Sequence, residues 1–460
     1  MTNNNRISIK GISICLLLLM SALGCQRFIE VKEPAQQVTA GAVFSDDMNA
    51  TAAINGIYSQ MIGGSSSFSS WMTTVLAGAA ADELLRFNAS VEEQELVTNA
   101  ITPDNNLVSI LWTSAYRTIY QCNAAIEGLG RPSAVSMPVR NQLLGEAHFV
   151  RAFCYSYLVQ SFGDVPLVLT TDWASNQGLS RNAVAEVYER ILSDLQKAGS
   201  LMSVSYPSAM KGRPNKWSAV AFSARILLLL GRWEEAALAA TEVLDKGGYL
   251  PLPSLPQVYL ANSREAIWQL VPDAVNYGYV PELRMPPFYT ANVPGYYLRP
   301  DLMMAFEPGD RRRSAWVDSV QYLGTRYYYP GKYKSLSGNT EYYVVLRAAE
   351  LLLIRADARA NMGYIAEGMQ DVNAVRLRAQ LPILSGAMSK DELLAAVYRE
   401  RRVELFAEWG HRWYDLKRTG RATQVLGRLK PDSWQPHDTL WPIHSGQLVL
   451  NPALRQNEGY

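Results

Sequence analysis

Histidines and carboxylates are the side chains of this sequence that could bind a metal or carry catalysis. The four histidines are His148, His411, His437 and His444. Glu408 and His411 match one Glu-x-x-His half of a di-iron site, but that chemistry needs two halves on facing helices, and the chain offers one. His437 and His444 lie in a proline-rich stretch without cysteines or paired acids at ligand spacing. The sequence therefore predicts no metal site.

Hydrolytic chemistry has equally little support in the motifs. No nucleophile elbow, phosphate-binding loop or dinucleotide fingerprint is present, which argues against the commoner hydrolases and nucleotide-dependent enzymes. A glycosidase needs only two carboxyl groups at the right separation, and sequence spacing does not reveal that separation. Asp82 with Glu83 and Glu307 with Asp310 are the acids to test, and the interpretation that we favour for them is solvated loop acids. We predict a protein that is not an enzyme and needs no cofactor.

Recognition chemistry is better represented, in an aromatic segment. Residues 277–333 contain ten Tyr, two Phe and one Trp, about twice the chain-wide aromatic fraction of 10%, interleaved with Pro, Gly and Asn and without helical periodicity. Tyrosine-rich loops present rigid, amphipathic faces at low entropic cost, so this segment is the predicted recognition surface. The competing interpretation is that most of these rings pack beneath the loops.

A repeated helical hairpin predicts the scaffold. Residues 217–245 consist of an apolar, alanine-containing run and an amphipathic run separated by Gly231, and residues 351–378 repeat this arrangement 132 positions later with Gly363 at the break. Such a pair cannot bury its apolar face alone, so stacked pairs of the tetratricopeptide kind are expected in a mostly α fold. Two ordinary hairpins that agree by coincidence are the alternative. The aligned positions are Ala224 with Ala356, Gly231 with Gly363, Trp233 with Ile365, Ala236 with Gly368 and Val243 with Val375.

Three further helices are predicted around this scaffold, over 45–61, 107–129 and 139–162. The stretch that follows Trp71 is rich in small residues, and pattern alone does not assign it a structure. Charges between 401 and 418 are interpreted as a network that caps and links helices.

Arg311, Arg312 and Arg313, beside Asp310, are interpreted as a salt-linked surface feature.

The N-terminus has the features of an export signal. A basic beginning precedes an apolar run over 12–20 and small residues before Cys25. We predict that 1–24 form a lipoprotein signal peptide, that Cys25 becomes lipidated and that 25–44 form a leash. A plain secretory signal is the alternative. A single body is expected over 45–460, held at a membrane through its lipid.

Charge and cysteine usage narrow the partners. Removal of the signal removes Arg6 and Lys10 and no acid, so the formal net charge passes from +1 to −1. Near-neutrality argues against a nucleic-acid partner. Cys122 and Cys154 lie in apolar helical patterns, where two buried thiols are favoured over one disulfide.

Ordered motifs occur across almost the whole mature chain. The first is the run from Glu146 to Leu167, which includes Arg151 and the ending Gly163-Asp-Val-Pro-Leu. The others are Gly231-Arg-Trp-Glu-Glu, Arg264-Glu-Ala-Ile-Trp268, Gly309-Asp-Arg311, Tyr329-Pro-Gly-Lys-Tyr333, Leu346-Arg-Ala-Ala-Glu350, the run 401–420, Trp441-Pro-Ile443 and the ending 451–460. In this order the motifs resemble those of the SusD/RagB family of Bacteroidetes outer-membrane lipoproteins.

This resemblance implies a tetratricopeptide-like scaffold with an irregular, loop-rich ligand-binding face that includes an aromatic insert at about 270–335. It implies non-catalytic capture of an oligosaccharide and delivery to a TonB-dependent transporter of the SusC/RagA kind, from a lipid-anchored, surface-exposed position on the outer membrane. Guided by where the family places ligand loops, the expected ligand-binding residues are Trp71, Asp82, Arg86, Tyr289, Asn292, Tyr296 and Tyr297.

Peptide capture, as in RagB-like members, a glycan-degrading enzyme and a scaffold without a small ligand are the alternatives. Family members destined for the exterior carry acids soon after the lipidated cysteine. Here the first is Glu30, so a body that faces the periplasm is the alternative location.

Overall fold

The computed structural model describes residues 43–63, 67–208, 210–272, 295–335 and 340–460. Helices dominate this part of the chain, which confirms the predicted fold class. Those of the N-terminal half are α3 (Asp47–Ile62), η2 (Phe68–Met72), α4 (Thr73–Ala80), α5 (Val91–Thr98), α6 (Asn106–Gly130), α7 (Met137–Phe162), α8 (Trp173–Asn176), α9 (Val184–Leu201), α10 (Lys216–Leu229) and α11 (Trp233–Lys246). Those that follow are η3 (Leu255–Gln257), α13 (Pro300–Ala305), α14 (Arg311–Trp316), α15 (Ala348–Met362), α16 (Ile365–Arg378), α17 (Lys390–Glu404), α18 (His411–Arg418), α19 (Ala422–Leu429), η5 (Pro436–Thr439) and α20 (Ser445–Leu450).

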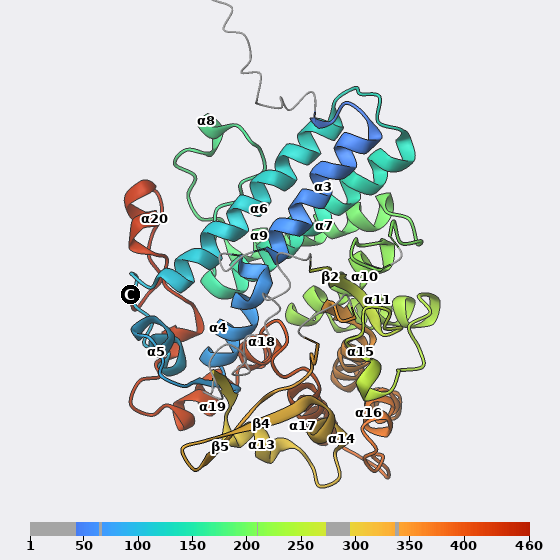
Figure 1. The fold of residues 1–460 in the computed structure, drawn as a ribbon, viewed down its shortest axis with the longest axis vertical. Helices are drawn as coiled ribbons and strands as arrows, with labels where there is room; N and C mark the ends of the chain where they lie inside the picture. Colours follow the sequence, from blue (N-terminus) through green and yellow to red (C-terminus); the bar gives the residue numbers. More distant parts are fainter. Residues whose placement is uncertain (1–42, 64–66, 209, 273–294, 336–339) are drawn as a thin grey trace, which may run out of the picture.

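The long helices form a continuous stack. α6 packs on α7, α7 on α9, α9 on α10, α10 on α11, α11 on α15, α15 on α16 and α16 on α17. Figure 1 shows α3, α6 and α7 running side by side in the upper half of the molecule, and the pairs α10/α11 and α15/α16 together on one flank. Every residue of α7 from Gly145 to Phe162 is buried, because neighbours cover this helix on all sides.

The two predicted hairpins have the same local geometry. Gly231 and Gly363 both adopt positive φ, at 68° and 87°, where they end the first helix of each pair. A residue without a Cβ tolerates this left-handed conformation at low cost. Ala236 is fully buried, and a Cβ added to the equivalent Gly368 would lie 2.9 Å from Leu393. The repeated small residue therefore permits close helix packing.

The stretch after Trp71 is helical, which the sequence did not predict. η2 and α4 continue one into the other, and all eight residues of α4 are buried. A helix covered on every side has no polar face, so its sequence lacks the period that identifies an amphipathic helix.

Three short antiparallel strand pairs interrupt the helices within the described residues. β1 (Leu84–Arg86) pairs with β3 (Tyr296–Leu298), β2 (Ala266–Leu270) with β6 (Tyr343–Arg347), and β4 (Val317–Tyr322) with β5 (Thr325–Pro330). The described part of the aromatic segment thus holds β3, β4, β5 and two six-residue helices, α13 and α14. Helices of six residues are too short to show a period in the sequence.

A buried ion-pair network ties the C-terminal helices to the rest, as the charges of 401–418 predicted. Glu404 lies 2.5 Å from Arg347 Nη1 and 3.2 Å from Arg312 Nη1, and it also contacts Arg378. Burial raises the pKa of Glu404, but these three guanidinium charges outweigh it, and the net pKa is lowered. Arg312 was expected at the surface and is fully buried, because α17 directs Glu400 and Glu404 toward α14.

Both cysteines of the helical body, Cys122 and Cys154, are free and buried, in agreement with the favoured prediction. Burial raises the pKa of Cys122 to about 12. Across the described ranges, no helix is both long and apolar enough to span a bilayer. Cys25 and most of the predicted leash lie outside the described residues.

Candidate functional site

β1 and β3 bring two of the predicted site residues into contact. Their antiparallel register sets Arg86 opposite Tyr296. The guanidinium carbon of Arg86 lies 5.0 Å from the centroid of the Tyr296 ring. Glu93 Oε1 accepts hydrogen bonds from Arg86 Nε at 3.0 Å and from the Tyr296 hydroxyl at 2.8 Å. Burial and the charge on Glu93 raise the pKa of the buried Tyr296, and the half-buried Arg86 and Glu93 link its hydroxyl to β1.

A second layer of rings lies on the opposite side of the strand pair. Successive strand residues face opposite sides, so the half-buried Tyr297 points away from the buried Tyr296. The Tyr297 ring lies 5.0 Å from that of Tyr327, and the Phe87 ring lies 5.7 Å from Tyr327 and 5.3 Å from Tyr322, all edge to face.

We call Phe87, Tyr297, Tyr322 and Tyr327 the aromatic platform. The strand register places Tyr322 opposite Thr325, two residues before Tyr327, so both hairpin tyrosines share one face. Each of the four rings keeps part of its surface in solvent. Figure 1 shows the β4–β5 hairpin at the lower end of the molecule, beside α13.

The other predicted site residues lie elsewhere or outside the described chain. Asp82 is buried, and its carboxylate accepts hydrogen bonds from Arg412 Nε and Nη2 at 2.7 and 2.9 Å. Trp71 lies on η2, where it packs half-buried against the main core. Tyr289 and Asn292 fall in 273–294, outside the described residues.

The four acids that a glycosidase could use are engaged in the protein itself, and the expectation of solvated loop acids was wrong for most of them. Asp82 pairs with Arg412, Asp310 with Arg312, and Glu307 with Arg376. Glu83 is fully buried, and its carboxyl group accepts a hydrogen bond from the backbone N–H of Ala407 at 3.3 Å.

Three members of the platform, Phe87, Tyr322 and Tyr327, were absent from the predicted site. The signal was present for two of them, since Tyr322 and Tyr327 flank the turn Leu323-Gly324 in the aromatic segment. Phe87 carries no local signal, because only the pairing of β1 with β3 brings residue 87 next to the hairpin.

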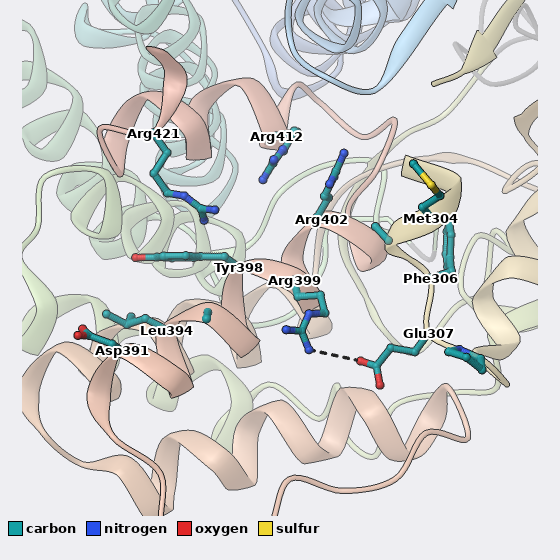
Figure 2. Close-up of a pocket in the computed structure, with 13 residues that line it drawn as sticks. Met304, Phe306, Glu307, Asp391, Leu394, Tyr398, Arg399, Arg402, Arg412 and Arg421 are labelled. Atoms are coloured by element: carbon teal, nitrogen blue, oxygen red, sulfur yellow. Dashed lines mark ion pairs between the residues drawn. The ribbon is translucent and has the colours of Figure 1, made fainter. Parts of the chain in front are cut away.

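A pocket of about 730 Å³ is lined by residues of α13, α17 and α18. α13 and the turn after it supply Met304, Phe306 and Glu307 to its wall, and α17 supplies Asp391, Leu394 and Tyr398. Figure 2 shows four arginine side chains around this space: Arg399, Arg402, Arg412 and Arg421. Among the described residues, no group of three His, Cys, Asp or Glu side chains is placed to hold a metal ion.

Comparisons with known proteins agree with this architecture. A SusD-like family model described as "Starch-binding associating with outer membrane" matches residues 27–228, and a model of the SusD family matches residues 314–460. SusD-like protein P2 of Formosa agariphila is 28% identical over 97% of this chain and 98% of its own length.

Solved structures extend the likeness to the fold. A SusD superfamily protein from Bacteroides vulgatus superimposes with a TM-score of 0.78 at 21% identity, covering 91% of this chain and all of that one. A laminarin-binding SusD-like protein superimposes with a TM-score of 0.76 at 22% identity, covering 90% of this chain and all of that one. From its helical stack, its ordered motifs and the two family models that together span most of its length, the chain belongs to the SusD/RagB family.

Proposed function

We propose that the protein captures an oligosaccharide on the aromatic platform, without cleaving it, for delivery to a TonB-dependent transporter of the SusC kind. The observation that carries the proposal is the platform itself, in which Phe87, Tyr297, Tyr322 and Tyr327 form a contiguous group of partly exposed rings. Flat aromatic rings offer apolar faces to the C–H faces of sugars, and neighbouring polar groups fix the hydroxyls.

The ion pairs that the candidate acids form with arginines support a binding role without catalysis. A glycosidase needs one carboxylic acid to protonate the leaving group and one carboxylate to act as nucleophile or base. Asp82 and Asp310 are buried in ion pairs with arginines, which keep both carboxylates away from solvent. Binding on the platform requires no covalent step.

The wider role rests on family membership and on the N-terminal sequence. The lipidated Cys25 would tether the body to the outer membrane, and the stack of helix pairs offers an extended face for the transporter. The laminarin-binding neighbour favours a saccharide over a peptide as the ligand.

Glycan and peptide arrays probed with the mature protein test the proposal. We expect hits among the glycans and none among peptides, and the bound glycan should be recovered intact by mass spectrometry. Hits confined to peptides would favour the RagB-like alternative, and shortened glycan products would reveal an enzyme.

A further inference from the structure

The pocket between α13 and α17 is lined by more cationic side chains than anionic ones. Arg399 and Arg402 come from α17, Arg412 from α18, and Arg421 caps the start of α19. Figure 2 shows these side chains on several sides of one space, with the Tyr398 ring below Arg421. We call this the arginine pocket.

Of the acids near the arginine pocket, Glu307 and Asp82 are already paired with arginines, whereas the exposed Asp391 of the wall has no arginine partner among the ion pairs of the described residues. Glu307 accepts hydrogen bonds from Arg376 at 2.7 and 3.0 Å and lies 3.9 Å from Arg399. Asp82, which is not one of the lining residues, accepts two hydrogen bonds from Arg412. Burial and the nearby charge of Asp82 raise the pKa of Glu83 to about 8, so near neutral pH this carboxyl adds little negative charge.

Two of the arginines have hydrogen-bonding capacity to spare. Arg402 Nη2 lies 2.8 Å from Asp82 Oδ2, yet within the described chain neither this nitrogen nor Nε of Arg402 forms a hydrogen bond, and both are buried. Among the described residues the contact found for the Arg421 guanidinium is with the Tyr398 ring, 5.3 Å from its centroid. Arg402 Nη2 is paired with the Asp82 carboxylate, so the donors left for an anion are Arg402 Nε and the Arg421 guanidinium, and a buried donor without an acceptor costs free energy.

The rest of the wall indicates what kind of molecule carries the anion. Met304, Phe306 and Leu394 add apolar surface beside the guanidinium groups. A volume of about 730 Å³ is within the range of small-molecule sites and far exceeds the need of an inorganic ion. Guanidinium groups bind carboxylate and related oxyanions in bidentate fashion, and the apolar surface suits the C–H face of a sugar ring.

We propose that the arginine pocket binds a carboxylate or sulfate group on a saccharide, so that the captured oligosaccharide is an acidic one. This inference rests on the proposed function. The pocket is connected to the platform through the chain, because β3 carries Tyr297 and leads directly into α13, whose end lines the pocket.

The test measures affinity by calorimetry for matched ligands. An oligogalacturonide is compared with its methyl-esterified, neutral form, and a sulfated galacto-oligosaccharide with its unsulfated form. The variants are Arg421→Gln and Arg399→Gln, whose side chains are partly exposed. The matched control is Arg313→Gln, an exposed arginine on α14 outside the pocket. The two ligand pairs tell carboxylate from sulfate.

We expect at least one acidic ligand to bind about tenfold or more tightly than its neutral form, with an affinity that falls as salt rises. This preference should disappear in Arg421→Gln and Arg399→Gln and persist in Arg313→Gln. Equal affinity for acidic and neutral forms, or a preference that survives both pocket variants, would overturn the inference while the platform proposal stands.

Failure of the proposed function itself gives a different pattern, in which no saccharide binds. The anion pocket is then judged with inorganic sulfate, through the shift in melting temperature that it causes. A shift that is lost in Arg421→Gln supports an anion site, and no shift overturns it. Arg421-dependent binding of an acidic peptide in place of a saccharide would overturn the saccharide assignment.

Discussion

Asp82 and Arg412 lie 330 positions apart in the sequence and form a buried, two-point ion pair. Burial raises the pKa of Asp82, but the hydrogen bonds and charge of Arg412 outweigh it and leave the pKa lowered. The pair fastens the segment before β1 to α18. It therefore holds β1 in position, and with it Arg86 and the following platform residue Phe87.

Loss of this ion pair should destabilise the fold. Asp82→Ala leaves the Arg412 guanidinium buried without its partner, and we expect a loss of about 3 to 5 kcal/mol in the free energy of unfolding. Urea denaturation provides the measurement. Glu235→Gln is the matched control, because its pair with Arg232 is exposed and surface pairs contribute little. A similar, small loss in both variants would show that Asp82 does not anchor β1.

Glu83 should make stability depend on pH. Its pKa is about 8 in the folded protein against an ordinary 4.5, so between these values the folded state binds more protons than the unfolded state. Stability from this group is therefore lost as pH rises, by at most about 1.4 kcal/mol per pH unit. Glu83→Gln removes this dependence. The unfolding free energy of the variant should therefore increase relative to that of the wild type as the pH rises from about 5 to 8. Parallel curves over that range would contradict the assignment.

Gly363 tests the repeated hairpin. Its φ is 87°, and an added Cβ would meet no atom within 4 Å, so Gly363→Ala measures backbone strain without a steric clash. We expect a loss of about 1 kcal/mol in the free energy of unfolding. Gly130→Ala is the control, since that site is equally open and its φ is not positive. Equal stability of the two variants would show that the left-handed turn is not required.

Cys25 governs the predicted anchor. Cys25→Ser removes the thiol that would carry the lipid, so the protein should move from the membrane fraction to the soluble fraction after cell lysis. Immunoblots of the two fractions report this movement, and protease treatment of intact cells reports which way the body faces. A Cys25→Ser protein that stays with the membrane would point to another mode of attachment.

The sequence predicted the scaffold better than the site. The spacing around Gly231 and Gly363 identified both helix pairs, because the residues that determine the packing of each pair lie within 30 positions of one another. α4 was missed, because a helix buried on all sides has no polar face.

The site was only partly predictable. Tyr297 and Tyr327 lie in the aromatic segment that the sequence indicated, but Phe87 joins them only through the pairing of β1 with β3, which are more than 200 positions apart in the sequence. The sequence predicted Arg402 and Arg412 only as members of an inter-helix charge network. The pocket that they line also needs residues of α13, which the sequence did not bring near them. Long-range register of this kind leaves no local pattern in the sequence.

Calorimetric titration of a glycan identified on the array, into the mature wild type and the double variant Tyr297→Ala/Tyr327→Ala, tests the central claim most directly. Tyr364→Ala, which removes an exposed tyrosine of the helical scaffold, is the matched control. We predict that the double variant loses at least about tenfold in affinity while the control binds as the wild type does, because packing of a sugar ring on each aromatic ring contributes roughly 1 kcal/mol. Unchanged affinity in a folded double variant would contradict the platform as the site of capture.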